Sequence, residues 1–202
     1  MKKPYGLTGS IGCGKSTVAG ILEELGAVVY YCDAIAGELI TDPAHREKII
    51  EILGTDSPFK GASVDKKILA GIIFSDQQVK EKLEKYLHPL VWGAIEWRMA
   101  FVPSKAVVFV ESALIYEIGW TNKFEAVLVV TCSEEEQVRR LRSIRGMNDL
   151  DISNRMYSQL SSREKESRAD TVISTECSRE SLEAEVKILY DKLKLFNQQE
   201  EE

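Results

Sequence analysis

The stretch GSIGCGKST, residues 9–17, constrains the fold of this chain more than any other feature. It fits the pattern G-x-x-x-x-G-K-[ST], in which a glycine-rich loop leads from a strand into a helix. Glycines let the backbone approach a phosphate closely and adopt the dihedral angles that wrapping it requires. Lys15 adds a positive charge for the β- and γ-phosphates, and the Ser16 hydroxyl can ligate Mg²⁺. The alternative, a glycine-rich turn before a helix, is disfavoured because a strand and an amphipathic helix flank the stretch.

Strand and helix patterns alternate along the chain, which predicts an α/β fold with right-handed crossovers. Short β-branched runs bounded by polar residues are typical of buried parallel strands. These runs are residues 5–8, 27–31, 107–111, 126–131 and 171–174. Apolar spacing predicts a helix over 15–25 and a closing helix over 181–195. We therefore expect a P-loop NTPase fold, with a five-stranded parallel sheet and helices on both faces.

Two connections between the predicted strands are far longer than the dozen or so residues that a parallel crossover needs. Residues 32–106 contain no convincing strand, but a helical pattern runs through Val79, Leu83, Leu87, Leu90, Val91, Ala94 and Ile95. Residues 132–168 form the second long connection. We expect two helical insertions, an acceptor-binding domain over 32–106 and a lid over 132–168, mounted on a nucleotide-binding core. The core would comprise 1–31, 107–131 and 169–197, followed by a disordered tail over 198–202.

The expected lid is rich in positive charge. Between residues 139 and 168 there are eight basic and four acidic side chains, a net charge of +4 in a chain whose formal net charge is -6. A solvated helical face accounts for most of these side chains, and a short RNA-binding helix is a further alternative. Phosphoryl transfer, however, gathers negative charge between donor and acceptor, where arginines accelerate the reaction. Arg140 is our candidate for that task.

Composition limits the class of protein. A general nucleic-acid binder is usually basic, so the net charge of -6 disfavours that class. Four scattered cysteines without metal-ligand spacing indicate reduced thiols. We find neither an apolar run that could span a bilayer nor a signal peptide. We expect a cytoplasmic protein, a monomer or weak oligomer, without nucleic-acid or membrane partners.

A GTPase switch is the main alternative among phosphate-binding classes. It needs a guanine-reading N-K-x-D sequence and a D-x-x-G sequence after the third strand. The chain offers Asn122-Lys123-Phe124-Glu125, which has Glu in place of Asp and precedes the fourth strand. No D-x-x-G follows Glu111. A small-molecule kinase needs room for an acceptor, a nearby carboxylate and an arginine-bearing lid, and the two insertions supply the room and the lid.

Almost the whole chain resembles the dephospho-CoA kinase family. GLTGSIGCGKST is close to that family's opening sequence, and YYCDAIAGEL resembles the exit of its second strand. The family's F-x-D…L…HP run is similar to IF-x-D at 73–76, Leu83 and His88-Pro89 of this chain. The end of its D-x-P-L-L-F-E strand is similar to VFVESALIYE. A further series resembles its lid and last strand: Gln137, Arg140, Leu141, Arg155, Gln159, Lys165 and Ala169-Asp170.

The chain departs from the family pattern at several positions. Ser10 and Cys13 replace the usual Gly and Ser, and Ala113 replaces Pro. The second lid arginine falls one position late, at Arg145, and Thr175-Glu176 replaces the Asn-Gly that follows the last strand. Tyr31 stands where the family often has the first Asp of a pair.

The resemblance implies ATP-dependent phosphorylation of the ribose 3′-hydroxyl of dephospho-CoA, with Mg²⁺. Another P-loop kinase of a nucleoside or small metabolite is the alternative. The residues expected to bind ATP are Gly9, Gly12, Cys13, Gly14, Lys15, Ser16 and Thr17. Those expected to act in catalysis are Asp33, Lys15 and Arg140. We expect Mg²⁺ to be held by Ser16 and, through water, by Glu111. We expect the acceptor to be bound by Asp33, His88 and Leu114.

Each of these residues also has a structural alternative. Asp33 follows the apolar run AVVYY, where it either serves as a base for the acceptor hydroxyl or caps a helix beginning near Ala34. Glu111 ends the strand VVFVE, at the position of a carboxylate that holds Mg²⁺, or else caps a helix. We favour a helix start or kink for His88 with Pro89 over a chemical task. Trp92 and Trp97 are expected in the core.

Overall fold

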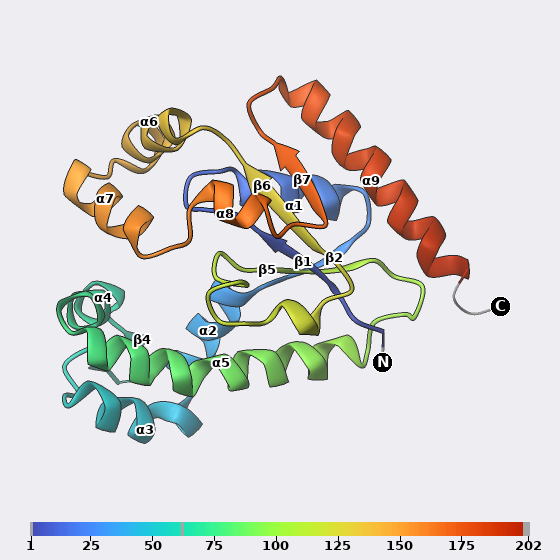
Figure 1. Ribbon diagram of the computed structural model, residues 1–202. Helices are drawn as coiled ribbons and strands as arrows, with labels where there is room; N and C mark the ends of the chain where they lie inside the picture. Colours follow the sequence, from blue (N-terminus) through green and yellow to red (C-terminus); the bar gives the residue numbers. More distant parts are fainter. Residues whose placement is uncertain (1, 62, 200–202) are drawn as a thin grey trace. The chain divides into compact units, whose positions relative to one another are not determined.

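The computed structural model describes residues 2–61 and 63–199. The chain divides into two compact units: residues 1–31 with 103–202, and residues 32–102 (Figure 1). In the first unit, five parallel strands follow the order β2-β5-β1-β6-β7. They are β1 (Tyr5–Thr8), β2 (Val28–Tyr31), β5 (Val108–Glu111), β6 (Val127–Thr131) and β7 (Thr171–Ser174). The parallel sheet is therefore confirmed, each strand lying within one residue of its predicted bounds.

The strand order places the functional stretches at one edge of the sheet. Strand β1 lies at the centre of the sheet, between β5 and β6. The chain runs from β1 to the edge strand β2, reverses there, returns through β5 and continues on the other side of β1 with β6 and β7. Because all five strands are parallel, their carboxyl ends meet at the same edge, where ligands bind in folds of this kind. The glycine-rich loop follows β1, and Glu111 is the last residue of β5.

Helices α1 (Lys15–Glu24) and α9 (Arg179–Gln199) pack with the sheet into one hydrophobic core. Val18 and Leu22 of α1 and Val186 of α9 are completely buried there against strand residues such as Phe109. The predicted spacing of apolar residues in both helices is confirmed. The closing helix reaches Gln199, so residues 198 and 199 of the expected disordered tail are helical, and residues 200–202 lie outside the described residues.

Gly6 faces the side of the sheet opposite to its neighbours Tyr5 and Leu7, and side chains from another segment approach its backbone closely there. A Cβ atom on Gly6 would lie 3.0 Å from Ile115 and 3.1 Å from Phe124. Both of these side chains come from the connection between β5 and β6. This connection is built of turns and one short helix, η1 (Thr121–Lys123), and packs its apolar side chains toward β1. The segment that resembled N-K-x-D thus overlaps a structural turn before β6.

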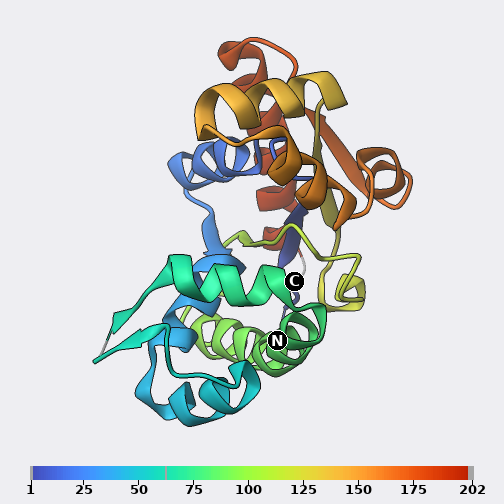
Figure 2. The same cartoon turned by 90° about the vertical axis from the view of Figure 1, so that its left-hand side faces the viewer.

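The second unit contains α2 (Cys32–Thr41), α3 (Pro43–Leu53), α4 (Lys66–Ser75) and α5 (Gln77–Met99). Figure 2 shows these helices, coloured blue to green, beside a short antiparallel hairpin. The hairpin pairs β3 (Phe59–Lys60) with β4 (Ser63–Val64), so the expectation of no strand in this segment was wrong. Leu83 and Leu87 of α5 pack with Ile49, Leu53 and Leu69 in a core of its own.

Helix α5 bears on the expectations for His88-Pro89 and for the two tryptophans. Pro89 lies inside this continuous helix, so His88-Pro89 does not start one, and a kink at this pair stays a prediction. Trp92 is buried as expected, but Trp97 is 67% exposed and contacts Phe101 edge to face. Helical periodicity identifies the core face of the middle of α5, whereas its last turn extends beyond that core.

The expected lid residues form α6 (Glu134–Arg145), α7 (Asp149–Tyr157) and α8 (Ser162–Glu166), all within the first unit. Each begins with a side-chain cap, from Ser133, Asn148 and Ser161 respectively. Such caps satisfy backbone N–H groups that have no partner within the helix. Among the described residues, no helix is both long and apolar enough to cross a membrane.

Candidate active site

The glycine-rich loop has the backbone geometry that its sequence predicts. Gly14 has φ 88° and directly precedes α1, so the loop turns into the helix through a left-handed residue. At Gly9, φ is 151° and a Cβ atom would lie 2.1 Å from the carbonyl oxygen of Val130. No side chain fits there without moving β6. The loop thus needs glycine for two separate reasons, one conformational and one steric.

Lys15 is folded back onto this loop. Its Nζ donates to the carbonyl oxygen of Gly9 at 2.8 Å and to that of Ser10 at 3.4 Å. It also lies 4.0 Å from Oε1 of Glu111, and both side chains are only 12% exposed. The Lys15 side chain is therefore largely buried without nucleotide. Neighbouring groups already hold its ammonium beside the loop.

Glu111 occupies the end of β5 and does not cap a helix. The next helical segment begins only at Thr121, so the helix-cap alternative is wrong. Strand pairing sets Glu111 beside Leu7 of β1 and Tyr31 of β2. Burial, together with a hydrogen bond to Glu23, raises the pKa of Tyr31 to about 12, and the negative charge of Glu111 adds to this effect. Tyr31 is thus a neutral donor, whose hydroxyl binds Glu23 at 2.9 Å.

A cavity of about 380 Å³ opens at the start of α1, and its lining combines loop, α6 and α9 residues. Its walls carry four basic side chains, which suits a polyphosphate. The lining residues are Gly12, Gly14, Lys15, Ser16, Thr17, Arg140, Leu141, Ile144, Arg145, Thr175, Cys177, Arg179 and Leu182. Arg145 lines this cavity despite its offset from the family pattern. Arg179 was missed from the sequence, because only the fold brings the first residue of α9 to this edge.

Arg140 is fixed at the wall of this cavity by three elements. Its Nε donates to Oε1 of Glu136 at 2.6 Å, and its Nη1 and Nη2 donate to Oγ1 and the carbonyl oxygen of Thr175 at 2.8 and 3.0 Å. Nη1 also donates to the carbonyl oxygen of Gly12 at 3.4 Å. Hydrogen bonds from Arg139 and then Arg140 lower the pKa of Glu136 to about 2. Glu136 therefore stays ionised at any physiological pH and orients Arg140 toward the loop.

The residues after β7 also support the loop. The Thr175 hydroxyl donates to the carbonyl oxygen of Cys13 at 2.9 Å while accepting from Arg140. Glu176 accepts from the backbone N–H and the hydroxyl of Ser133, at 2.9 and 2.6 Å, at the start of α6. Where the family has Asn-Gly, this chain thus uses both side chains to join β7 to the loop and to α6.

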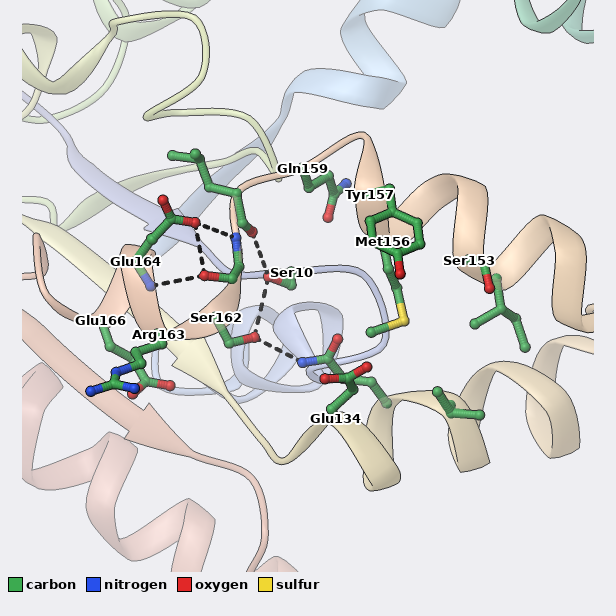
Figure 3. A pocket seen from close by; sticks show the side chains of 15 residues that line it. Ser10, Glu134, Ser153, Met156, Tyr157, Gln159, Ser162, Arg163, Glu164 and Glu166 are labelled. Atoms are coloured by element: carbon green, nitrogen blue, oxygen red, sulfur yellow. Dashed lines mark hydrogen bonds between the residues drawn. The ribbon is translucent and has the colours of Figure 1, made fainter.

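A second cavity of about 590 Å³ lies among α6, α7 and α8, next to Ser10 (Figure 3). Its polar edge joins the expected lid to the loop. The Ser162 hydroxyl donates to Oγ of Ser10 at 3.3 Å, and Gln137 Nε2 donates to Oγ of Ser162 at 2.8 Å. Oε1 of Gln159 accepts from the backbone N–H of Ile11 at 3.0 Å. Gln137 and Gln159, which belong to the family series, therefore position the loop.

Lys165 of the same series is a buried structural cation. It is 0% exposed, and its Nζ donates to the carbonyl oxygen of Ala113 and pairs with Glu117 at 2.8 Å. Fully buried lysines are rare unless they are paired. This pair attaches α8 to the segment that follows Glu111.

The remaining predicted site residues lie in different units. Leu114 is half-buried in the first unit, three residues after Glu111. Asp33 and His88 belong to the second unit. Asp33 lies exposed in the first turn of α2, which begins at Cys32, so it is not the N-cap that the structural alternative required. Burial lowers the pKa of His88, so its ring is neutral at pH 7.

The fold and this site define a P-loop kinase: a parallel sheet, a phosphate-binding loop after its first strand, and a cavity lined by arginines from a helical insertion. The dephospho-CoA kinase family model matches residues 5–180. The chain belongs to that family of enzymes, as its sequence motifs indicate. The GTPase and RNA-binding alternatives are accordingly set aside.

Individual relatives agree with this family. A dephospho-CoA kinase of Geobacter sulfurreducens is 35% identical over 191 residues, covering 93% of this chain and 96% of that protein. A crystal structure of a Thermus thermophilus protein is similar with a TM-score of 0.81 and 30% identity, over 95% of this chain and 98% of that one. A dephospho-CoA kinase from Campylobacter jejuni has a TM-score of 0.65 and 25% identity, over 95% and 97% of the two chains.

Proposed function

We propose that this chain transfers the γ-phosphoryl group of ATP to the ribose 3′-hydroxyl of dephospho-CoA, giving CoA and ADP, the last step of coenzyme A synthesis. The observation that carries the proposal is the cavity shared by Lys15, Ser16 and Thr17 of the loop and Arg140 of α6. Phosphoryl transfer depends on positioning and on electrostatic stabilisation of the transferring group. A ring of basic groups around a phosphate loop supplies both.

Groups of the loop and of the neighbouring helices would each contact the phosphates of ATP. Backbone N–H groups from Gly12 to Thr17 wrap the phosphates, and the N-terminus of α1 favours their negative charge. Lys15 leaves the carbonyls of Gly9 and Ser10 and follows the γ-phosphoryl group. Arg140 is held by Glu136 close to the same phosphates, so it need not be ordered during the reaction.

The oxygen groups at this edge fit Mg²⁺. Ser16 offers a hydroxyl at the cavity, and Glu111 offers a carboxylate at the end of β5. No group of three or more His, Cys, Asp or Glu side chains is gathered for a metal in residues 2–61 and 63–199. Mg²⁺ usually binds through one or two protein oxygens, substrate phosphates and water, so a larger protein cage is not required. Bound between Ser16 and, through water, Glu111, it would neutralise charge on the β- and γ-phosphates.

The acceptor would be handled by Asp33, His88 and Leu114. The Asp33 carboxylate orients the ribose hydroxyl and takes its proton late in the transfer. His88, which is neutral at pH 7, offers a hydrogen bond without adding charge. Leu114 offers an apolar contact close to Glu111 along the chain. The helices of residues 32–102 hold the pantetheine arm and the nucleotide of the acceptor.

A direct assay tests the proposal. We expect purified protein with ATP and Mg²⁺ to convert dephospho-CoA to CoA, with one ADP formed per CoA, as measured by chromatography and mass spectrometry. A 3′-deoxy analogue of dephospho-CoA is the matched control and should accept no phosphate. Faster phosphorylation of a nucleoside from a panel would favour the alternative, a nucleoside or metabolite kinase.

We expect Arg140→Ala to lower kcat by at least about tenfold while changing the KM for dephospho-CoA much less. A lid arginine acts mainly on the transition state, so its loss reduces the rate more than acceptor binding. Arg142→Ala is the matched control, because Arg142 lies on the same helix, is 57% exposed and pairs only at the surface with Asp149. Steady-state kinetics of both variants measure the difference. Equal losses would indicate that the total positive charge of α6 matters, and not the placement of Arg140.

A further inference from the structure

Two buried cysteines of one hydrophobic cluster lie at the glycine-rich loop. Cys13 is a loop residue and is 0% exposed, and Cys132, which directly follows β6, is 5% exposed. Both belong to the hydrophobic core of the first unit. The Cys132 thiol donates to the carbonyl oxygen of Gly12 at 3.9 Å, so its sulfur lies at the residue next to Cys13. The proposed phosphate binding uses the backbone of Cys13 and leaves both thiols without a task.

Polar side chains of α6 and α8 lie next to this pair of cysteines. Sγ of Cys13 lies 3.8 Å from Oγ of Ser162. The side-chain amide of Gln137 donates both to Oγ of Ser162, at 2.8 Å, and to the carbonyl oxygen of Cys132, at 3.3 Å. Figure 3 draws the bonds of Ser162 to Ser10 and to Gln137. The amide of Gln137 thus links Cys132 to Ser162, the hydroxyl next to the Cys13 sulfur.

These surroundings separate the two thiols chemically. A hydrogen bond from Cys132, aided by Ser162 and by the positive charge of Lys15, lowers the pKa of Cys13 against the opposing effect of burial. The same interaction raises the pKa of Cys132. The thiolate is the nucleophile in cysteine chemistry, and burial in apolar surroundings alone would suppress it. Cys13 is therefore the reactive partner, and Cys132 keeps the proton.

We propose that Cys13 and Cys132 form a peroxide-sensitive dithiol. Its oxidation to a disulfide reversibly weakens the binding of ATP. The Cys13 thiolate attacks one oxygen of hydrogen peroxide, the O–O bond breaks, and the released hydroxide takes up a proton to become water. This leaves Cys13 as a sulfenic acid. The Cys132 sulfur then attacks the Cys13 sulfur, the S–S bond forms, and the hydroxyl group leaves as a second water. Two thiols and one peroxide thus give one disulfide and two waters.

The disulfide affects ATP because of where it ties the loop. A disulfide demands Cβ atoms about 3.5 to 4.5 Å apart and a fixed dihedral angle between them. Cys13 lies between Gly12 and Gly14, whose backbone must keep its shape to wrap phosphate. A covalent bond from Cys13 to the end of β6 pulls this backbone out of that shape, so the loop no longer wraps the triphosphate. This consequence for ATP rests on the proposed function, whereas formation of the disulfide does not.

The test uses the full chain, first reduced and then treated with hydrogen peroxide. We expect a mass loss of two hydrogens, a peptide containing linked Cys13 and Cys132, and two of the four cysteines still open to alkylation after denaturation. ATP affinity, measured by calorimetry, should fall at least about tenfold and return with dithiothreitol. ATP bound beforehand should slow the oxidation. A protein that forms the disulfide yet binds ATP unchanged would overturn the switch, and one that forms no linked peptide would overturn the dithiol.

Variants separate the contributions of the cysteines. Cys132→Ser should give no linked peptide, whereas Cys177→Ser, which removes the exposed thiol, should still form the disulfide. The ATP affinity of Cys13→Ser, whatever its starting value, should not respond to peroxide, and a response would contradict the assignment of Cys13. Failure of the reduced parent protein to bind ATP would contradict the proposed function instead. The mass measurement would then still decide whether the dithiol exists.

Discussion

Lys15→Ala is expected to lower kcat by at least about 100-fold. The ammonium group of Lys15 is the charge that follows the γ-phosphoryl group, and alanine leaves that charge without a counterpart in the transition state. A 100-fold loss corresponds to about 2.7 kcal/mol of transition-state stabilisation. Initial rates at saturating ATP and dephospho-CoA measure it. A rate within about threefold of the parent would contradict the assignment of the loop as the phosphate site.

The structure adds a stability measurement to this prediction. Without nucleotide, Lys15 donates to the carbonyls of Gly9 and Ser10 and lies beside Glu111. Alanine removes these donors, so a small fall in melting temperature should accompany the loss of rate. Lys105→Ala is the matched control: it removes the same charge from an exposed position of the first unit and should change neither quantity. Comparing the two variants separates the chemistry of Lys15 from its support of the loop.

The sheet could be predicted from the sequence because its strands are short, apolar and bounded by polar residues. Each of the five lies within a residue of its expected position. The hairpin β3–β4 could not be predicted, since two strands of two residues have no periodicity. Pro89 inside α5 shows that a sequence rule can also predict a break in a helix where the structure has none. A local rule against proline in helices gives way here, where α5 buries apolar residues both before and after Pro89.

The phosphate loop could be predicted because its chemistry is local in sequence. Side chains that reach the site from other elements could not be predicted, since only the fold brings them there. Arg179 lines the cavity because α9 begins at the same edge of the sheet as α1. Thr175 replaces an asparagine of the family pattern, yet holds both the loop and Arg140. No pattern in the sequence indicates such bonds.

Asp33→Asn is expected to lower kcat by at least about 100-fold while the protein stays folded and binds ATP. A ribose hydroxyl is a poor nucleophile, and a carboxylate within hydrogen-bond reach both orients it and receives its proton. General bases of this kind contribute roughly 10²- to 10⁴-fold to a rate. Asparagine is nearly the same size and can still orient the hydroxyl, but it cannot take the proton. The expected loss therefore falls on kcat, with a much smaller change in the KM for dephospho-CoA.

The alternative is that Asp33 serves only α2. Because α2 begins at Cys32, Asp33 lies in the first helical turn, where a carboxylate stabilises the helix by about 0.3 to 1 kcal/mol through the helix dipole. Asp42→Asn is the matched control. Asp42 caps α3 in the same unit by accepting from the N–H of Ala44 at 2.9 Å, and asparagine caps a helix about as well. Asp42→Asn should thus leave both melting temperature and kcat near the parent values. If Asp33→Asn slightly lowers the melting temperature but keeps kcat near the parent value, Asp33 only stabilises the helix, and the base that accepts the ribose proton is another residue.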